Sequence, residues 1–436
     1  MDKFELTDET MVLEDVRVDR NMYKDVTLHR IRALKDFTCQ GRTVHKGDLG
    51  GWVGNEWNLS QDGDCWLFDE SKAYLSAEVY GNAYISDYAE VYNEAKVFDN
   101  AQIYDDAQIY NYARVHEDAL VYDGASVCDM ADVYGDASIF GSAHIYGNAQ
   151  VYNLAQVYGG ATINDDAEVY GNAKVFGDAF ICDNAKVYDT AFVGEHAYID
   201  DNARVGGSSI IRGHAKVFDN AKVFGNAVIA EKARVCDRAT IYDKAKVYGN
   251  TLICGCTEIF DNAKIFGNAQ VRDFALVYEN AKVCGNAQVY DSAEVRNNAQ
   301  VCDNAQVYDN AQVYHRARVF GNAQVFDNAQ VYDDARIFGT AQICDNANVC
   351  GKITIGDKTK ICGNSFVSGN SGIYGKSVIY NSAYGTWDYD GYKKVKVYDA
   401  IVKNNEQIFD EDNNLDERPR DEDIDNKDDF DIGDDD

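Results

Sequence analysis

Histidine is the side chain in this sequence that is best suited to proton transfer at neutral pH, because its ordinary pKa is about 6.5. His196 and His214 are the leading candidates for a general base, since they flank the least regular stretch of a repetitive chain, residues 205–211. Neither has a repeat-breaking acidic residue beside it in the sequence. A histidine on a surface turn is the simpler interpretation, so the sequence assigns no catalytic residue.

Twelve cysteines offer thiol chemistry. Pairs such as Cys236 and Cys254 stand eighteen residues apart and would be neighbours if eighteen residues made one turn of a coil. Metal binding or disulfide formation would need such contact, but no CxxC doublet is present and the spacing is that of the repeat. We therefore expect reduced thiols that replace aromatic residues, and no metal site. The cysteines at this repeat position are Cys128, Cys182, Cys236, Cys254, Cys284, Cys302, Cys344, Cys350 and Cys362.

Aspartates recur in DNA and DDA triplets throughout the chain. Carboxylates are the ligands that Ca²⁺ prefers, but nothing matches the glycine-rich nonapeptide that binds calcium in other repeat proteins. Solvated charge at turns is the simpler interpretation. The segment GGSSIIRG at 206–213 lacks the lysine and the strand-to-helix context of a phosphate-binding loop.

A six-residue repeat determines where all of these side chains lie. Ala77, Ala83 and Ala89 are six residues apart, and each is followed two residues later by Val79, Ile85 or Val91. The aliphatic position then recurs at every sixth residue from position 67 to position 379 without an insertion. A short internal period of this kind indicates one elongated repeat structure and not several globular domains.

Alternation within the repeat predicts which side chains are buried. Successive residues of a strand point to opposite sides, so alanine and valine share one side, whereas Tyr or Phe and a Gln, Lys, Glu or Arg share the other. Repeated charged groups cannot be buried without partners, so the alanine and valine side is the interior. The remaining pair, commonly Gly-Asn or Asp-Asn, is typical of tight turns.

Strand and tight turn every six residues predict an all-β, parallel β-helix. The pattern resembles the left-handed hexapeptide-repeat solenoid, in which three hexapeptides form one triangular coil, and the handedness is implied by that resemblance. About 18 coils are then expected, with aromatic residues stacked in ladders along the outer edges. Such ladders either stabilise the stack, at about 0.2 to 1 kcal/mol per pair, or form an adhesive face. The predicted ladders are Tyr134, Tyr152, Tyr170 and Tyr188 on one edge and Tyr104, Tyr122, Phe140, Tyr158 and Phe176 on another.

The ends of the chain leave the repeat frame. Residues 1–62, which include Trp52 and Trp57, predict an N-terminal cap, followed by the β-helix over 63–383. Residues 384–403, which include Trp387, predict a C-terminal cap. The acidic segment 404–436 is expected to be a disordered tail, because a block of like charge repels itself and stays solvated.

The N-terminal segment resembles a known family. LHRIRALKDF (28–37), KGDLGGWVG (46–54) and NLSQDGDCWLFDE (58–70) are similar to the entry segment of the YdcK family of bacterial hexapeptide-repeat proteins. The resemblance covers roughly the first 75 residues. Members carry the name of acetyltransferases or transferases without an established substrate, so the resemblance implies acyl transfer. It supplies no catalytic motif, and no residue role is carried over.

The net charge of the chain argues against two classes of binding partner. The formal net charge is −32, whereas nucleic acids and anionic membranes require a basic surface, so neither is an expected partner. Residues 1–16 lack the basic and apolar regions of a signal peptide, and no apolar run is long enough to span a bilayer. We expect a cytoplasmic protein.

Together these features predict a non-catalytic β-solenoid rod that needs no cofactor. It would act as a structural scaffold or a binding surface through its outward Tyr and Phe ladders, by self-association or with a protein or polysaccharide. One alternative is a trimeric hexapeptide-repeat acyltransferase that uses acetyl-CoA on an unknown substrate. A second alternative is a polysaccharide-binding solenoid.

Overall fold

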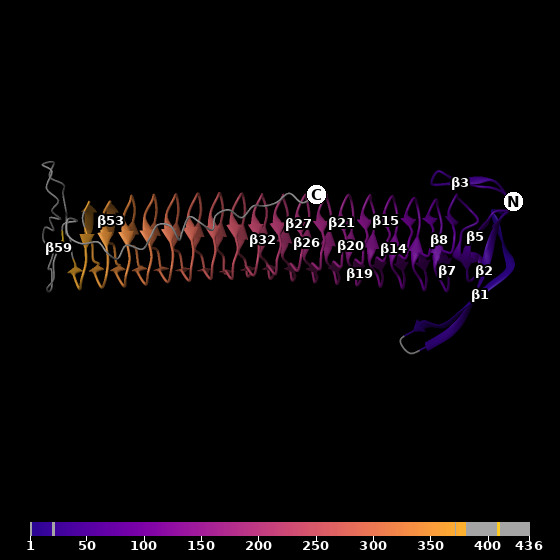
Figure 1. Cartoon of the computed structure of the whole chain (residues 1–436), viewed down its shortest axis with the longest axis horizontal. Helices are drawn as coiled ribbons and strands as arrows, with labels where there is room; N and C mark the ends of the chain where they lie inside the picture. The colour runs from indigo at the N-terminus through magenta and orange to yellow at the C-terminus, as the bar shows by residue number, and fades with distance from the viewer. Residues whose placement is uncertain (1, 20–21, 371, 381–407, 410–436) are drawn as a thin grey trace.

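The repeat folds into a rod of stacked coils. The computed structural model describes residues 2–19, 22–370, 372–380 and 408–409. Strands β6 (Trp66–Leu67) to β52 (Gln342–Ile343) are each two residues long and begin at six-residue intervals. Each pairs in parallel with the strand three places on; for example, Lys96 of β11 (Lys96–Val97) pairs with Arg114 of β14 (Arg114–Val115). Three parallel sheets therefore run along the rod, and the prediction of an all-β solenoid of about 18 coils is confirmed (Figure 1).

The interior of the rod is made of the small and aliphatic residues of the repeat. Ala215 and Val217, like their equivalents in nearly every coil, are completely buried. At each corner the first turn residue has a positive φ, such as 59° at Asp219 and 71° at Gly225. Gly, Asn and Asp tolerate this left-handed conformation best, which explains why they recur at the corners.

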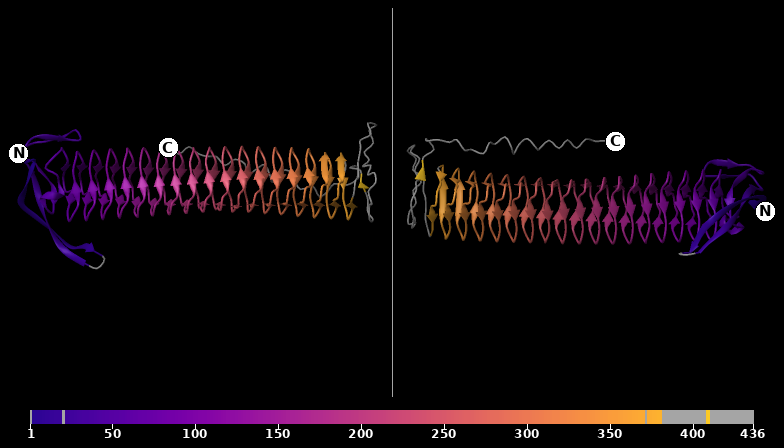
Figure 2. Two further views of the ribbon diagram at one scale, coloured as in Figure 1. Left: turned by 180° about the vertical axis from the view of Figure 1, so that it is seen from behind. Right: turned by 60° about the horizontal axis from the view of Figure 1, so that its bottom comes forward.

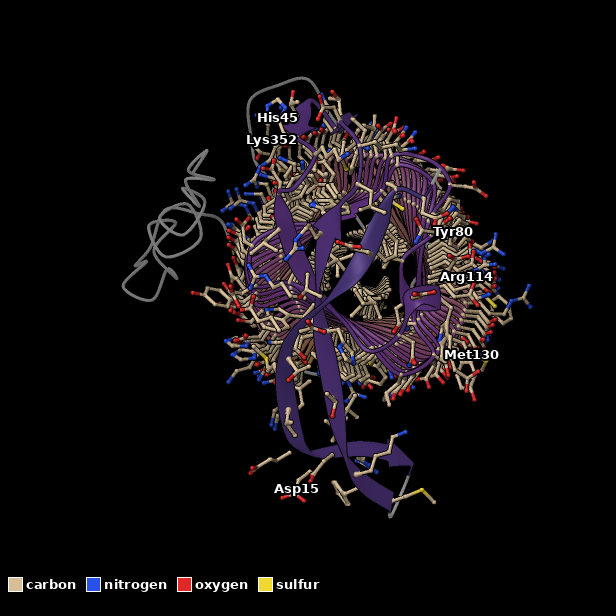
Figure 3. All side chains as sticks on the ribbon, turned by 90° about the vertical axis from the view of Figure 1, so that its right-hand side faces the viewer. Asp15, His45, Tyr80, Arg114, Met130 and Lys352 are labelled. Atoms are coloured by element: carbon tan, nitrogen blue, oxygen red, sulfur yellow. A yellow bond between two sulfur atoms is a disulfide. The ribbon has the colours of Figure 1, made fainter. Side chains whose placement is uncertain are left out.

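Polar and aromatic side chains cover the outside. An end-on view shows side chains radiating from the three-sided cross-section, with Tyr80, Arg114 and Met130 on its rim (Figure 3). The predicted division between a dry interior and an outer surface with the tyrosines is correct. Most of the tyrosines are half-buried, because each ring packs against the aromatic rings of the adjacent coils and keeps one edge in solvent.

The N-terminal segment adds an arm to the rod. Strands β1 (Phe4–Asp19) and β2 (Met22–Ala33) form a long antiparallel hairpin, with Asp15 near its tip. This hairpin extends sideways from the first coils (Figure 2). Asp15, in the outer part of the hairpin, lies well outside the cross-section of the rod (Figure 3). The sequence predicted a cap here without predicting a projecting arm.

The rest of the N-terminal segment closes the first coil. A short hairpin, β3 (Phe37–Cys39) with β4 (Arg42–Val44), places Phe37 edge-on to Trp66 at a centroid distance of 5.3 Å. Strand β5 (Leu49–Val53) pairs with β2 and in parallel with β7 (Lys72–Ala73), so coil stacking begins within the segment predicted as a cap. After it comes the short 3-10 helix η1 (Glu56–Asn58). No helix of the described residues is long and apolar enough to cross a membrane.

The C-terminal coils are less regular. Strands β53 (Asn348–Gly351) and β56 (Phe366–Gly369) have four residues each, and the last coil holds β57 (Gly372–Ile373) and β58 (Val378–Ile379). Strand β59 (Ile408–Phe409) pairs antiparallel with β57. The predicted cap at 384–403 lies outside the described residues, as does the predicted tail apart from β59.

Candidate functional site

The two candidate histidines lie on one corner of the rod, one coil apart. Their rings stack with centroids 4.8 Å apart and planes within 5° of parallel. The Nδ1 atom of His196 lies 3.4 Å from a carboxylate oxygen of Asp178, on the preceding coil. An acidic partner is therefore present, and it comes from a position eighteen residues earlier in the sequence. The side chains of His196 and Asp178 are 55% and 67% exposed, so water surrounds them and an acyl group bound there would not be shielded.

A better enclosed histidine and carboxylate lie elsewhere. His116 is sandwiched between the rings of Phe98 and Tyr134, at centroid distances of 4.6 and 5.2 Å. Its Nε2 lies 3.1 Å from Asp132, which also binds Arg114. Burial raises the pKa of Asp132, but the hydrogen bonds with His116 and Arg114 outweigh it and hold the pKa below its usual value. The cluster is a closed ion-pair network between coils, without room for a substrate among these stacked rings.

Two further histidines also have partners on adjacent coils. The imidazole of His144 hydrogen-bonds to the Ser126 hydroxyl, and Nδ1 of His315 lies 3.0 Å from Asp333. Sequence analysis missed these pairs because the partners are eighteen residues apart. A comparison of residues eighteen positions apart in the sequence would have identified these pairs.

A shallow groove follows the corner near His315. Arg316, which lines the groove, forms an ion pair with Asp334 at 2.7 Å. Arg316 and Lys352 thus lie among Asp333 and Asp334, and the groove offers no concentrated charge of one sign. The groove is lined by Asn297, Asn298, His315, Arg316, Asp333, Asp334, Gly351, Lys352 and Asn370.

The aromatic side chains of both predicted sets stack along the rod. The Tyr134 and Tyr152 rings have centroids 4.9 Å apart and planes within 2° of parallel, and Tyr104 and Tyr122 are 4.9 Å apart at 8°. The contacts continue to Tyr188 on one edge and to Phe176 on the other. Because the rings cover each other's faces, a ladder presents ring edges to solvent. Sugars stack on ring faces, so this geometry favours a stabilising role over polysaccharide binding.

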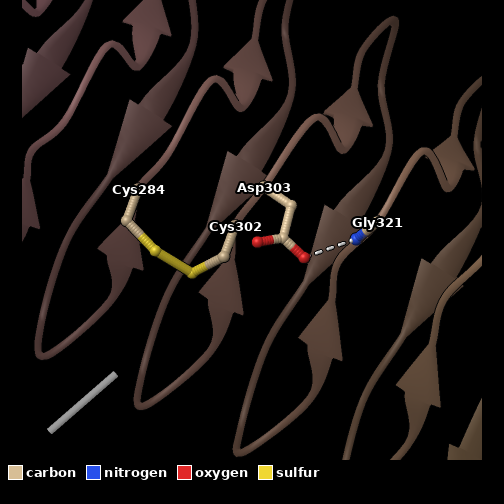
Figure 4. Close-up of a disulfide and its surroundings, with 4 residues drawn as sticks. All are labelled: Cys284, Cys302, Asp303 and Gly321. Atoms are coloured by element: carbon tan, nitrogen blue, oxygen red, sulfur yellow. Dashed lines mark hydrogen bonds between the residues drawn. A yellow bond between two sulfur atoms is a disulfide. The ribbon is translucent and has the colours of Figure 1, made fainter. Parts of the chain in front are cut away.

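Corner aspartates join successive coils. A side-chain oxygen of Asp237 accepts a hydrogen bond from the backbone N–H of Gly255 at 2.8 Å, and Asp303 accepts one from Gly321 at 2.9 Å (Figure 4). Many corners repeat this contact at the same eighteen-residue spacing. The aspartates expected to be solvated charge at turns therefore have a further role, because those of one coil accept hydrogen bonds from the turn amides of the next.

One cysteine pair is oxidised. Cys284 and Cys302 form a disulfide between adjacent coils (Figure 4), which corrects the expectation that all cysteines are reduced. Coil stacking brings their Cα atoms to 4.5 Å, within the range that a disulfide requires. The other ten cysteines are free. Two pairs of these, Cys236 with Cys254 and Cys344 with Cys362, have the same eighteen-residue separation.

A row of basic residues was missed by sequence analysis. Lys246 pairs in register with Lys264, and Lys264 with Lys282, on one of the three sheets. Arg318 and Arg336 continue the row after a single glutamine. This is a local concentration of positive charge in a chain with a net charge of −32. It becomes visible only when every eighteenth residue is compared.

Comparisons with known proteins agree with the repeat type. The YdcK β-solenoid repeat profile matches residues 101–117. The protein named "Uncharacterized acetyltransferase YdcK" of Escherichia coli (strain K12) is 38% identical over 60 residues, which make up 14% of this chain and 17% of that protein. The expected resemblance to the YdcK-like family is confirmed. The match spans about a sixth of the curated relative, so it does not extend to that protein as a whole.

Proposed function

We propose that this protein is a non-catalytic rod that holds repeated surfaces in a fixed geometry for a partner or for further copies of itself. The main support is the regularity of the coils. From β6 to β52 every strand begins six residues after the one before it, so no loop projects from this part of the solenoid. An enzyme on such a scaffold needs a local departure from repetition to enclose its substrates.

Inter-coil contacts further support a mechanical role. Aromatic stacking, asparagine ladders and corner carboxylates all connect residues on adjacent coils; Asn328, for example, donates to Asn346 at 3.2 Å. Stability in such repeat proteins comes mainly from the interfaces between neighbouring units. The projecting β1–β2 arm makes the two ends of the rod different, which would give an assembly a direction.

The experiment that tests this proposal measures shape and association together. We expect small-angle scattering and sedimentation velocity to report an elongated particle whose mass rises with protein concentration, or that acquires mass when a partner is added. Deletion of the β1–β2 arm should separate association at the end from association along the sides. A monomer at every concentration that also binds acetyl-CoA would contradict the proposal.

An acetyl-CoA-dependent acyltransferase is the second candidate. The name of the Escherichia coli relative and the stacked His196 and His214 beside Asp178 favour it. The exposed corner fits this role poorly, unless a trimer brings another subunit against it. Acetyl-CoA should then raise the melting temperature of the wild type, and His196→Asn with His214→Asn should abolish that increase. The polysaccharide-binding alternative is tested by a glycan array with the same preparation.

The cytoplasm is our proposed location. Free thiols at ten of the twelve cysteines fit a reducing compartment. Fractionation of the native source, with thiols trapped at lysis, tests this proposal. Recovery of the protein outside the cell would contradict it.

A further inference from the structure

Two of the free cysteine pairs lie beside a carboxylate. Cys236 and Cys254 are on adjacent coils, and Asp237 follows Cys236 at the corner. Their two Sγ atoms and one carboxylate oxygen lie within 4.8 Å of one another. Cys344, Asp345 and Cys362 repeat this arrangement six coils further along the same edge. We refer to these as the Cys236 cluster and the Cys344 cluster.

The disulfide pair provides a comparison within the same molecule. Cys284 and Cys302 have the same separation on another edge, but Gly285 follows the first cysteine in place of an aspartate. The carboxylate of Asp303, which follows the second cysteine, is directed to the backbone of Gly321 (Figure 4). The two free pairs therefore differ from the oxidised pair in having an aspartate directly after the first cysteine.

We propose that the Cys236 cluster and the Cys344 cluster each bind one thiophilic divalent ion, with Zn²⁺ the best match. Two thiolates and a carboxylate belong to the ligand set that Zn²⁺ prefers, and a water molecule would complete a tetrahedron. Zn–S bonds of about 2.3 Å place ligand atoms roughly 3.5 to 3.8 Å apart. The ligand atoms of each cluster therefore need to close by only about 1 Å, which side-chain rotation provides.

In both clusters a hydrogen bond orients the carboxylate that would bind the cation. In each, the aspartate carboxylate accepts a hydrogen bond at 2.8 Å from a backbone N–H of the next coil, from Gly255 for Asp237 and from Gly363 for Asp345. Such outer hydrogen bonds orient metal ligands. Cys236, Cys344 and Cys362 are buried, whereas Cys254 is half-buried and Asp237 is exposed, which leaves a side open to solvent for the water ligand.

The thiols of Cys236 and Cys254 share a hydrogen bond, which together with burial raises the pKa of Cys236. The hydrogen bond with Cys236, together with the weaker effect of Arg272 one coil further on, lowers the pKa of Cys254. At the Cys344 cluster burial raises the pKa of Cys344 to about 12, and Lys360 opposes this increase. Binding of a metal ion displaces these thiol protons, so both clusters should bind the ion more weakly as the pH falls.

Titration of the reduced, tag-free full-length chain with Cd²⁺ under argon tests the proposal. Cd²⁺ reports thiolate ligands by a charge-transfer absorbance, and native mass spectrometry counts bound Zn²⁺ in parallel. We expect two ions per chain. Cys236→Ser with Cys254→Ser should remove one ion, and Cys344→Ser with Cys362→Ser should remove the other. Asp237→Asn should weaken the first site by about tenfold or more.

The disulfide pair supplies the matched control. Cys284→Ser with Cys302→Ser should leave both ions bound, and circular dichroism should show an unchanged fold in every variant. Cd²⁺ binding without thiolate absorbance, or binding that the cysteine variants leave unchanged, would overturn the proposal and assign the metal to corner carboxylates. Recovery of both clusters as disulfides from the protein as isolated would also overturn it. These outcomes do not depend on whether the rod is a scaffold or an enzyme.

Discussion

The phenol ring of Tyr188 covers Gly206 on the next coil, where an added β-carbon would lie 2.4 Å from the ring. Phe176 covers Gly194 in the same way on another edge, with an added β-carbon 2.3 Å from the ring. Each of these aromatic ladders therefore ends on a glycine that leaves room for the last ring. Gly206, within the irregular stretch 205–211, therefore provides the space into which the Tyr188 ring packs.

Gly206→Ala should destabilise the rod by about 1 to 3 kcal/mol, because the new methyl group displaces the Tyr188 ring in a packed ladder. Urea unfolding, with hydrogen exchange to localise the change, measures this effect. The double variant with Tyr188→Ala is the control, since it removes the ring that clashes. An equal cost of Gly206→Ala in the presence and absence of the ring would show that the contact is not the cause.

Asp200 makes the stability depend on pH. Burial, with a further contribution from Asp201, raises the pKa of Asp200 to about 6. Since this value lies above the unfolded value of about 3.9, the folded state holds the proton more tightly, and stability falls as pH rises from about 4 to 6. Asp200→Asn should therefore raise the melting temperature at about pH 7.5 and have little effect near pH 4. Equal shifts at both pH values would contradict the assignment.

Thr257 occupies an interior position that holds alanine in the coils on either side, Ala239 and Ala275. Within the described chain its buried hydroxyl has no hydrogen-bond partner. Thr257→Val keeps the volume and removes this hydroxyl, so it should stabilise the protein by about 1 kcal/mol in urea unfolding. Ser209→Ala is the opposite control: its hydroxyl donates to the Gly206 carbonyl at 2.8 Å, and its removal should destabilise the protein.

Reduction of the Cys284–Cys302 bond should loosen its two coils. The bond closes a loop with a sequence separation of 18. Closing a loop of about this size stabilises a fold by about 3 kcal/mol on chain-entropy estimates. Faster amide exchange in those coils after addition of dithiothreitol measures the loss. The doubly substituted Cys284→Ser, Cys302→Ser protein should not respond to the reductant; a response there would assign the effect to another thiol.

The fold was predictable because each hexapeptide contains both the strand pattern and the turn residues of its own part of the coil. Alternation of alanine and valine with polar residues identifies the dry side, and Gly or Asp before Asn identifies the corner, so every unit indicates the same local structure. The arm formed by β1 and β2 lies outside the repeat, where no periodicity predicts how the hairpin leaves the rod.

The candidate site was less predictable because its contacts join residues on different coils. His116 meets Asp132, and Cys284 meets Cys302, only after the coils have stacked. The six-residue repeat determines whether a side chain faces the interior or the solvent. The contacts of a reactive side chain depend instead on which residues lie on the coils before and after it. The bond between Cys284 and Cys302 also shows that equal spacing does not determine redox state, since Cys236 and Cys254 have the same spacing and remain free.

The constant eighteen-residue turn makes this molecule extensible in whole steps. Inserting one turn would lengthen it by about 4.8 Å and leave all vertical rows aligned. Inserting a single hexapeptide would instead rotate every later row by a third of a turn, pulling Cys302 away from Cys284. Changes in length during evolution should therefore come as duplications of complete turns, and Cys128, Cys182 and Cys236, which recur every three turns, fit such a history.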